Sequence, residues 1–384
     1  MASLDGHSLQ RIAPTVDGEV RLGSGMYGDI LITGGAGFVG STLAIRLKAE
    51  FPSARVTSLD NLHRRGSELN LPRLAEAGVE FAHGDVRSAD DLAAVPPPEL
   101  MIDCSAEPSA QAGYGGSPGY LIHTNLTGCV HLLELARRHG TRFVFVSTSR
   151  VYPFPTLNRL YAREDSTRFT LLEDQSVPGA SGQGIAEEFP LQGPRSLYGM
   201  TKLASELIVE EYADAYGLPT IIDRFGLLSG PWQMAKSDQG VIALWAAAHY
   251  FKKPLAYIGF GGSGKQVRDA LHVDDFCDLI VHQARNFDLY AGKRFNAGGG
   301  LANSLSLRET TRLCEEVTGN RIEIASVAEN RPADVRSYVT DHRSLSAASG
   351  WQPRRDARTI VADICGWLRA EETRLRPLFY PGAA

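Results

Sequence analysis

Two residues four positions apart carry the chemistry most specific to this sequence: Tyr198 and Lys202, in the run Tyr198-Gly-Met-Thr-Lys202. Side chains four residues apart on a helix share one face, so the ammonium group would lie beside the phenol. A phenol has an ordinary pKa of about 10 and is a poor base at neutral pH, but a neighbouring positive charge favours its ionised form. The pair therefore indicates a general base. The same spacing also arises by chance on exposed helices, so the surrounding sequence must decide whether the pair is catalytic.

A glycine-rich turn near the start of the chain supplies that context. Gly34, Gly37 and Gly40 are spaced GxxGxxG between a short apolar run and a helix-like run. Glycines there let the pyrophosphate of a dinucleotide approach the N–H groups at a helix start. Asp60 ends the second apolar run, and a carboxylate at that place binds ribose hydroxyls and repels a 2′-phosphate. We therefore expect NAD rather than NADP; a purely structural glycine turn is the alternative.

Other polar groups end the strands expected after this turn. Ser147 and Thr148 close an apolar run, and hydroxyls at the carboxyl end of a strand lie where ligands bind in open α/β sheets. Asp85 and Val86 follow the third run, where they would lie beside the adenine. The alternatives are a satisfied strand-end hydroxyl for Thr148 and an ordinary turn for the Asp85 region.

The elements that must position these groups alternate along the chain. Short apolar runs at 29–33, 54–60, 79–83, 100–104, 142–147 and 220–223 alternate with helix-like stretches, clearest at 38–50, 119–139 and 198–217. This alternation predicts an α/β fold, a doubly wound parallel (Rossmann) sheet covered on both faces. Past about residue 225 it loosens, which predicts a smaller C-terminal substrate lobe. We expect a tail at 1–28, an NAD-binding domain at 29–225 to which 270–297 returns, and a lobe made of 226–269 and 298–384.

Composition excludes several other classes of protein. The chain has 384 residues, of which 43% are hydrophobic, and this is enough to bury a core and argues against disorder. A net charge of −5 and the lack of a basic-aromatic stripe give no reason to expect nucleic acid. The sequence has no apolar run long enough to predict a membrane span, and its first 28 residues lack a secretory signal pattern. We therefore expect a cytoplasmic protein. The five Cys and ten His show no metal-ligand spacing, which predicts no metal site.

Together these motifs resemble the extended short-chain dehydrogenase/reductase (NAD-dependent epimerase/dehydratase) family, most of whose members act on nucleotide sugars. The resemblance implies that Tyr198 is the catalytic base, Lys202 binds the nicotinamide ribose and Thr148 hydrogen-bonds the reacting oxygen. It also implies a homodimer or homotetramer through the helices near 119–139 and 198–217. The residues expected to contact NAD are Gly34, Gly37, Phe38, Val39, Asp60, Asn61, Asp85, Val86, Ser105, Ala106, Asn125, Ser147, Tyr198, Lys202 and Arg224.

Several stretches are similar to one subfamily, the CDP-tyvelose 2-epimerases, also called CDP-paratose 2-epimerases. They are Ser149-Arg-Val-Tyr152, an insertion at 157–169, and Asn303-Ser-Leu-Ser-Leu307. The 4,6-dehydratases of the family place Asp-Glu after the catalytic Thr as acid and base, whereas this chain has Ser149 and Arg150 there. The resemblance implies epimerisation at C2 of a CDP-linked deoxysugar. Epimerisation at another carbon, dehydrogenation of a UDP- or GDP-sugar, and a non-catalytic NAD(H)-binding regulator are the alternatives.

Eight residues are expected to face the sugar nucleotide. Guanidinium groups pair with phosphate oxygens in a bidentate way, which suits Arg268, Arg331 and Arg336, although each arginine could instead form a surface salt bridge. Glu107 either points at the sugar or is a solvated surface charge. The full set is Glu107, Thr148, Ser149, Arg150, Gln266, Arg268, Arg331 and Arg336.

Overall fold

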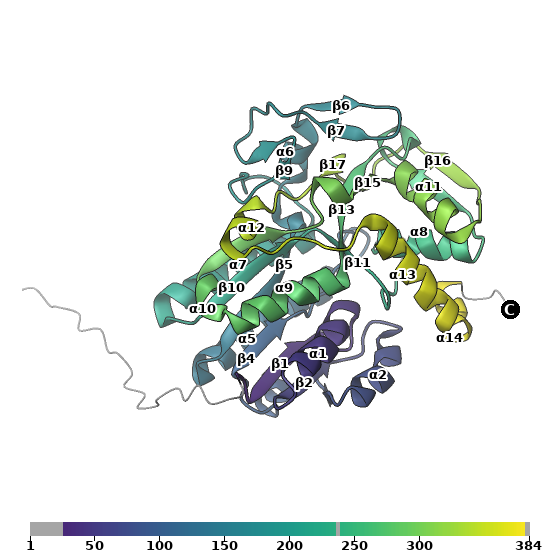
Figure 1. Cartoon of the computed structure of the whole chain (residues 1–384). Helices are drawn as coiled ribbons and strands as arrows, with labels where there is room; N and C mark the ends of the chain where they lie inside the picture. Colours follow the sequence, from purple (N-terminus) through teal and green to yellow (C-terminus); the bar gives the residue numbers. More distant parts are fainter. Residues whose placement is uncertain (1–25, 236–238, 381–384) are drawn as a thin grey trace, which may run out of the picture.

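The computed structural model describes residues 26–235 and 239–380, and a seven-stranded parallel sheet lies at its centre (Figure 1). The strand order is β14-β10-β5-β4-β1-β2-β3. The strands are β1 (Asp29–Thr33), β2 (Arg55–Asp60), β3 (Glu80–His83), β4 (Leu100–Asp103), β5 (Arg142–Thr148), β10 (Thr220–Phe225) and β14 (Lys293–Ala297). The predicted doubly wound α/β sheet is thereby confirmed. The order reverses between β1 and β4, which places a ligand crevice beyond their carboxyl ends.

Helices cover both faces of this sheet. On one face α1 (Phe38–Glu50) and α9 (Val273–Arg285) share a core with Ile30 and Ile32 of β1. On the other face α5 (Gly128–His139) and α7 (Leu197–Tyr216) pack over Leu31 of the same strand. Successive strand residues point to opposite faces, so a strand covered on both sides must be apolar throughout. This is why the sequence shows continuous apolar runs.

The second half of the chain builds a smaller lobe. A four-stranded sheet contains β11 (Leu227–Ser229), β13 (Val267–His272), β15 (Ser304–Ser306) and β17 (Ser337–Tyr338), while β12 (Leu255–Ile258) pairs with β16 (Ile324–Val327). Helices α8 (Val241–Tyr250), α11 (Leu307–Thr318) and α13 (Ala357–Ala370) share a separate apolar core. None of the helices within the described ranges is long and apolar enough to cross a membrane.

An insertion between β5 and α7, at the top of Figure 1, forms a fourth apolar cluster. It contains α6 (Phe154–Arg159) and the hairpin-like pairs β6 (Ala162–Glu164) with β7 (Phe169–Leu171) and β8 (Ala180–Ser181) with β9 (Gly184–Ile185). The remaining α-helices are short: α2 (Leu71–Glu76), α3 (Ala89–Ala93), α4 (Gly119–Ile122), α10 (Phe287–Tyr290), α12 (Arg343–Ser349) and α14 (Glu372–Phe379).

The predicted N-terminal tail is too long at its C-terminal end. Tyr27 is only 2% exposed, its ring meets Phe51 edge-on, and its hydroxyl donates to the Ala284 carbonyl at 2.6 Å. Tyr27 therefore belongs to the core under α9, because a large aromatic ring gains more from burial than from solvent. The part of the predicted tail at 1–25 lies outside the described residues.

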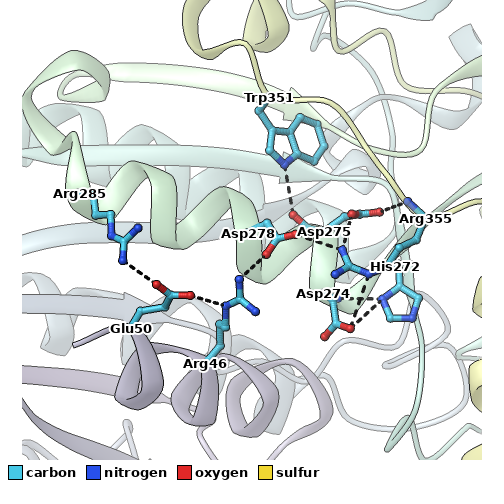
Figure 2. Close-up of polar contacts among 9 residues, drawn as sticks. All are labelled: Arg46, Glu50, His272, Asp274, Asp275, Asp278, Arg285, Trp351 and Arg355. Carbon is cyan, nitrogen blue, oxygen red and sulfur yellow. Dashed lines mark hydrogen bonds and ion pairs between the residues drawn. The ribbon is translucent and has the colours of Figure 1, made fainter. Parts of the chain in front are cut away.

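A polar network joins the first helix, α9 and the C-terminal chain (Figure 2). Arg46 of α1 donates to Asp278 of α9 at 2.9 Å. Arg355, which precedes α13, donates to the Asp275 carboxylate through its backbone N–H at 3.0 Å and through Nη1 at 2.6 Å. Asp275 is 1% exposed, so these bonds satisfy a buried charge. The network fixes α1, whose N-terminus begins at the glycine turn.

Candidate active site

The glycine turn between β1 and α1 is tightly packed against neighbouring backbone, as the glycine spacing predicts. Gly34 has φ +63°, and a Cβ there would lie 2.7 Å from the carbonyl oxygen of Cys104. A Cβ at Gly40 would lie 2.2 Å from the Gly34 oxygen, so the first turn of α1 packs directly on the loop. The Gly37 N–H donates to Gly34 at 3.0 Å. Only glycine fits at Gly34 and Gly40, and the N-terminus of α1 is left open to an anion.

Asp60 closes the same turn from the end of β2. Its carboxylate accepts from the N–H groups of Ala36 at 3.1 Å and Leu62 at 2.8 Å. Burial raises the pKa of Asp60, and these N–H groups oppose that change. At the next strand end Asn61 donates to Asp85 at 2.9 Å. The side chains predicted to hold the adenosine therefore lie together at the ends of β2 and β3.

A cavity of about 490 Å³ lies where the sheet, the insertion and the smaller lobe meet. Its size is that of a small-molecule site. Twelve of the predicted site residues line it: Phe38, Val39, Ala106, Ser147, Thr148, Ser149, Arg150, Tyr198, Lys202, Gln266, Arg268 and Arg331. The structure thus brings the start of α1, the end of β5, the first turns of α7 and the lobe to one place.

The first turns of α7 present Tyr198 and Lys202 to this cavity. The hydroxyl of Ser196 caps the helix by accepting from the Gly199 N–H at 3.1 Å, which fixes where α7 begins. The Lys202 ammonium lies 4.2 Å from the centre of the Phe145 ring. Opposite α7, the Thr148 hydroxyl accepts from the Arg150 N–H at 3.2 Å. A phenol, an ammonium and a hydroxyl therefore line one cavity beside a dinucleotide turn.

The lobe side of the cavity carries positive charge. Arg150 donates to the Ala333 carbonyl at 3.2 Å, and Arg268 donates to Asp334 at 3.1 Å and to the Val335 carbonyl at 2.6 Å. Burial lowers the pKa of Arg268 to about 10; the charge of Arg150 adds to this, and Asp334 opposes it. Both arginines hold the segment 333–335, so two guanidinium groups gather on this side of the cavity.

Two predicted contacts are contradicted by the structure. Arg224 is 0% exposed and its guanidinium binds Glu206 through Nε and Nη2, so it lies beneath the cavity and cannot touch a cofactor. Arg336 donates to the Leu160 carbonyl at 2.5 Å and lies over the Phe169 ring, so it holds the insertion rather than lining the cavity. In both cases the guanidinium contacts a partner within the protein, namely Glu206 for Arg224 and the Leu160 carbonyl for Arg336.

Of the two alternatives for Glu107 in the loop after β4, the structure does not support the one that points at the sugar. The Glu107 carboxylate accepts from the Ser109 N–H at 3.3 Å, so it caps its own turn, and it is not among the cavity-lining residues described. Asn125 accepts from the Glu107 N–H at 2.8 Å and donates to Thr201 at 3.1 Å, which ties the loop to α7.

Two further residues predicted to contact the cofactor already have partners within the protein. Ser105 donates to Asp103 at 2.5 Å. Val86 is buried against Gly128.

Sequence reasoning missed two groups that shape the site. Glu206 lies one helical turn after Lys202, is 0% exposed and accepts from the Ser147 hydroxyl at 2.5 Å. Tyr152 lines the cavity at 2% exposure. The four-residue spacing from Lys202 to Glu206 was the available signal, since it places a carboxylate on the same helix face. In the described ranges no group of three or more His, Cys, Asp or Glu is arranged to hold a metal ion.

A glycine turn at the sheet's reversal point, with a Tyr–Lys pair lining the cavity beside it, is typical of enzymes that bind a nicotinamide dinucleotide. The sequence profile of the NAD dependent epimerase/dehydratase family matches residues 30–298. The chain belongs to this family, and NAD is its cofactor.

Named relatives include both epimerases and dehydratases. A CDP-paratose 2-epimerase of Salmonella typhi is 30% identical over 88% of this chain and 98% of its own length. A dTDP-glucose 4,6-dehydratase of Streptomyces antibioticus is 28% identical over 91% of this chain and 95% of its own. The crystal structure of the dTDP-glucose 4,6-dehydratase of Streptomyces venezuelae with NAD has a TM-score of 0.72 and 28% identity, covering 91% of this chain and 99% of its own.

Proposed function

We propose that this protein is an epimerase of nucleotide sugars that inverts C2 of a CDP-linked deoxysugar, as between CDP-paratose and CDP-tyvelose. The observation that carries the proposal is the pair that follows Thr148 in the cavity wall, Ser149 and Arg150. An oxidation followed by a reduction needs the base and the hydroxyl donor but no further acid. The similarity to the Salmonella typhi CDP-paratose 2-epimerase supports the choice of sugar and carbon.

The residues around the glycine turn fit a bound dinucleotide. A Cβ would fill the cradle at Gly34 or Gly40, and the open N-terminus of α1 suits a pyrophosphate. Asp60, already oriented by two N–H groups, would hold the adenosine ribose. A dinucleotide held by these residues would supply the hydride acceptor for the oxidation of the sugar carbon and the hydride donor for its reduction on the opposite face. Phe38 and Val39 line the cavity beside this turn and would lie against the dinucleotide.

The chain's own groups carry the proton. Tyr198, acting as the general base, takes the proton from the sugar hydroxyl at its Oη and gives it back after the resulting ketose has turned over. Thr148 donates a hydrogen bond to the reacting oxygen, and Lys202 lies on the same face of α7 as Tyr198, one helical turn further on. The ketose must turn while its nucleotide stays bound. Arg150, Arg268 and Arg331 on the lobe side of the cavity would anchor the diphosphate during that turn.

Elimination of water is a poorer fit, although dehydratases are among the relatives. A dehydratase needs an acid and a base at the sugar besides the tyrosine. Of the described lining residues, Asp334 alone carries a carboxylate, and that carboxylate is held by Arg268 and by the Val335 N–H. This carboxylate therefore already has partners within the lobe, and the described lining offers no second carboxylate to complete an acid–base pair.

A chromatographic assay tests the proposal. Purified protein without added cofactor is incubated with paired CDP-, UDP- and GDP-sugars, and Tyr198→Phe is the matched control. With the unaltered protein we expect CDP-paratose and CDP-tyvelose to reach the same equilibrium ratio whichever of the two is supplied. With Tyr198→Phe we expect no conversion. Conversion of another sugar pair would show that the enzyme inverts a different carbon or uses a different nucleotide. Turnover that requires free NAD, or a dehydrated product, would refute an epimerase.

We also propose a homodimer formed by α5 and α7, as in the family that the sequence resembles. Leu207 of α7 is 53% exposed and Tyr216 is 59% exposed, so the helix has apolar surface to cover. Light scattering on the purified protein measures the mass, and a monomer would refute the proposal.

A further inference from the structure

A continuous chain of buried hydrogen bonds runs beneath the cavity. The Ser147 hydroxyl donates to Glu206 at 2.5 Å, and Arg224 binds the two oxygens of Glu206 at 3.0 and 2.6 Å. Arg224 Nη1 donates to the Tyr152 hydroxyl at 3.1 Å, and this hydroxyl donates to Asn296 at 2.8 Å. The chain therefore joins β5, α7, β10, the segment after β5, and β14.

The Glu206–Arg224 pair in the middle of this chain holds both ends of one segment. Ser147 and Tyr152 bracket Thr148, Ser149 and Arg150, which form the end of β5 and a short 3-10 turn. All five of these residues line the cavity. The segment also touches α7 directly, because a Cβ at Gly199 would lie 2.1 Å from the Arg150 carbonyl oxygen. The position of the segment relative to α7 is thus fixed at the site itself.

We call the Glu206–Arg224 pair, with its bonds to Ser147 and Tyr152, the clamp. Its Glu206 lies on the same helix as the base, Tyr198. Glu206 follows Tyr198 and Lys202 along α7, at two turns and one turn respectively. A bond from Glu206 to Ser147 therefore fixes the strand end that carries Thr148 against the helix that carries Tyr198. Proton transfer and hydride loss need the sugar oxygen between these two hydroxyls, and small displacements of such groups are costly to rate.

The cost of burying the ion pair argues against a purely stabilising role. Glu206 and Arg224 are both 0% exposed, and charges removed from water repay their desolvation only with full hydrogen bonding. Burial would lower the pKa of Arg224, but Glu206 outweighs it and raises that pKa, so the guanidinium stays charged. Apolar residues of similar volume would fold about as well. What they would not provide is a directed contact to Ser147 and Tyr152.

We infer that Glu206 and Arg224 are positioning residues, which hold Thr148 at its working distance from Tyr198 by clamping Ser147 and Tyr152. Neither residue touches the substrate. The inference rests on the proposed function for its kinetic readout, and on cofactor binding for a readout that needs no substrate.

The principal test is the double variant Glu206→Leu/Arg224→Met. We expect a melting temperature close to that of the unaltered protein, kcat lower by about 10- to 100-fold, and KM for the nucleotide sugar within about threefold. A fluorescence titration with NADH should show several-fold weaker binding, because the freed Ser147 lines the cavity. The matched control is Glu210→Leu/Arg294→Met, which removes another pair between α7 and the sheet outside the cavity lining and should leave kcat and NADH affinity unchanged.

A folded double variant whose kcat and NADH affinity stay within twofold would overturn the inference. If the double variant does not fold, Tyr152→Phe decides, since it removes a single hydroxyl from the chain. A drop in kcat of about 10-fold at constant melting temperature supports the clamp, and an unchanged kcat overturns it. If the unaltered protein turns over no nucleotide sugar, the proposed function fails and the NADH titration alone decides the inference.

Discussion

Replacing Asp223 with Asn should make the protein more stable, by an amount that depends on pH. Asp223 lies on β10 at 0% exposure. Its Oδ1 accepts from Gln283 at 3.0 Å, whereas Oδ2 has no hydrogen-bond partner among the described residues. Burial raises the pKa of this carboxyl from 3.8 to about 7, and the Gln283 bond opposes the shift. An asparagine keeps the bonded oxygen and places its amide where no bond is lost.

The size of the effect follows from the two pKa values. Between about pH 4 and about pH 7 the unfolded chain has released the proton that the folded protein still holds, so stability falls as pH rises. A shift from 3.8 to about 7 corresponds to a penalty of about 4 kcal/mol above pH 7, or about 1.4 kcal/mol per pH unit. Below about pH 4 both states are protonated and the penalty vanishes.

Urea unfolding of the two proteins across this pH range measures the difference directly. We expect the stability of Asp223→Asn minus that of the unaltered protein to rise with pH and to level off above about pH 7. Other titrating groups cancel in the subtraction. Asp214→Asn, which removes an exposed carboxylate from α7, is the matched control variant. A pH-independent difference for Asp223→Asn would refute the assignment of a neutral buried carboxyl.

Three further substitutions test the site and its support. Tyr198→Phe should lower kcat by about 10³-fold while NADH still binds, and a variant with full turnover would rule out the phenol as base. Gly40→Ala forces a Cβ to within 2.2 Å of the Gly34 oxygen and should weaken NADH binding by at least 10-fold in a fluorescence titration; equal affinity would mean that the turn can relax. Asp275→Asn weakens the charged bonds to Arg355 and should cost about 2 kcal/mol in urea unfolding, with kcat retained; unchanged stability would show that the network in Figure 2 contributes little.

The order of strands and helices was predictable because both faces of the sheet are covered. A strand such as β1 must be apolar at every position, and that run is visible without any partner. The glycine turn was visible for a similar reason, since the close approaches at Gly34 and Gly40 leave no room for a side chain. Both signals are local in the sequence.

The errors come from contacts that join distant parts of the chain. Arg224 ends a strand, where a ligand contact is expected, but Glu206 on α7 captures it 18 residues away. Arg336 donates to the carbonyl of Leu160, 176 residues away in the insertion. Tyr27 looked like part of a polar tail, because the pocket under Phe51 and Ala284 exists only in the folded core. The type of a charged or aromatic side chain shows that it needs a partner or a buried pocket, but the sequence does not show which residue provides it.

The position of β14 in the sheet sets the order in which the chain can fold during synthesis. When residues up to Phe225 have been made, β10 is an open edge strand, and the sheet face that α9 will cover is bare. These surfaces stay exposed until residues 273–297 have followed, after much of the smaller lobe. Open edges and bare apolar faces invite aggregation. Truncation at residue 225 should therefore yield insoluble protein, and expression of the nucleotide-binding half alone requires α9 and β14 to be supplied with it.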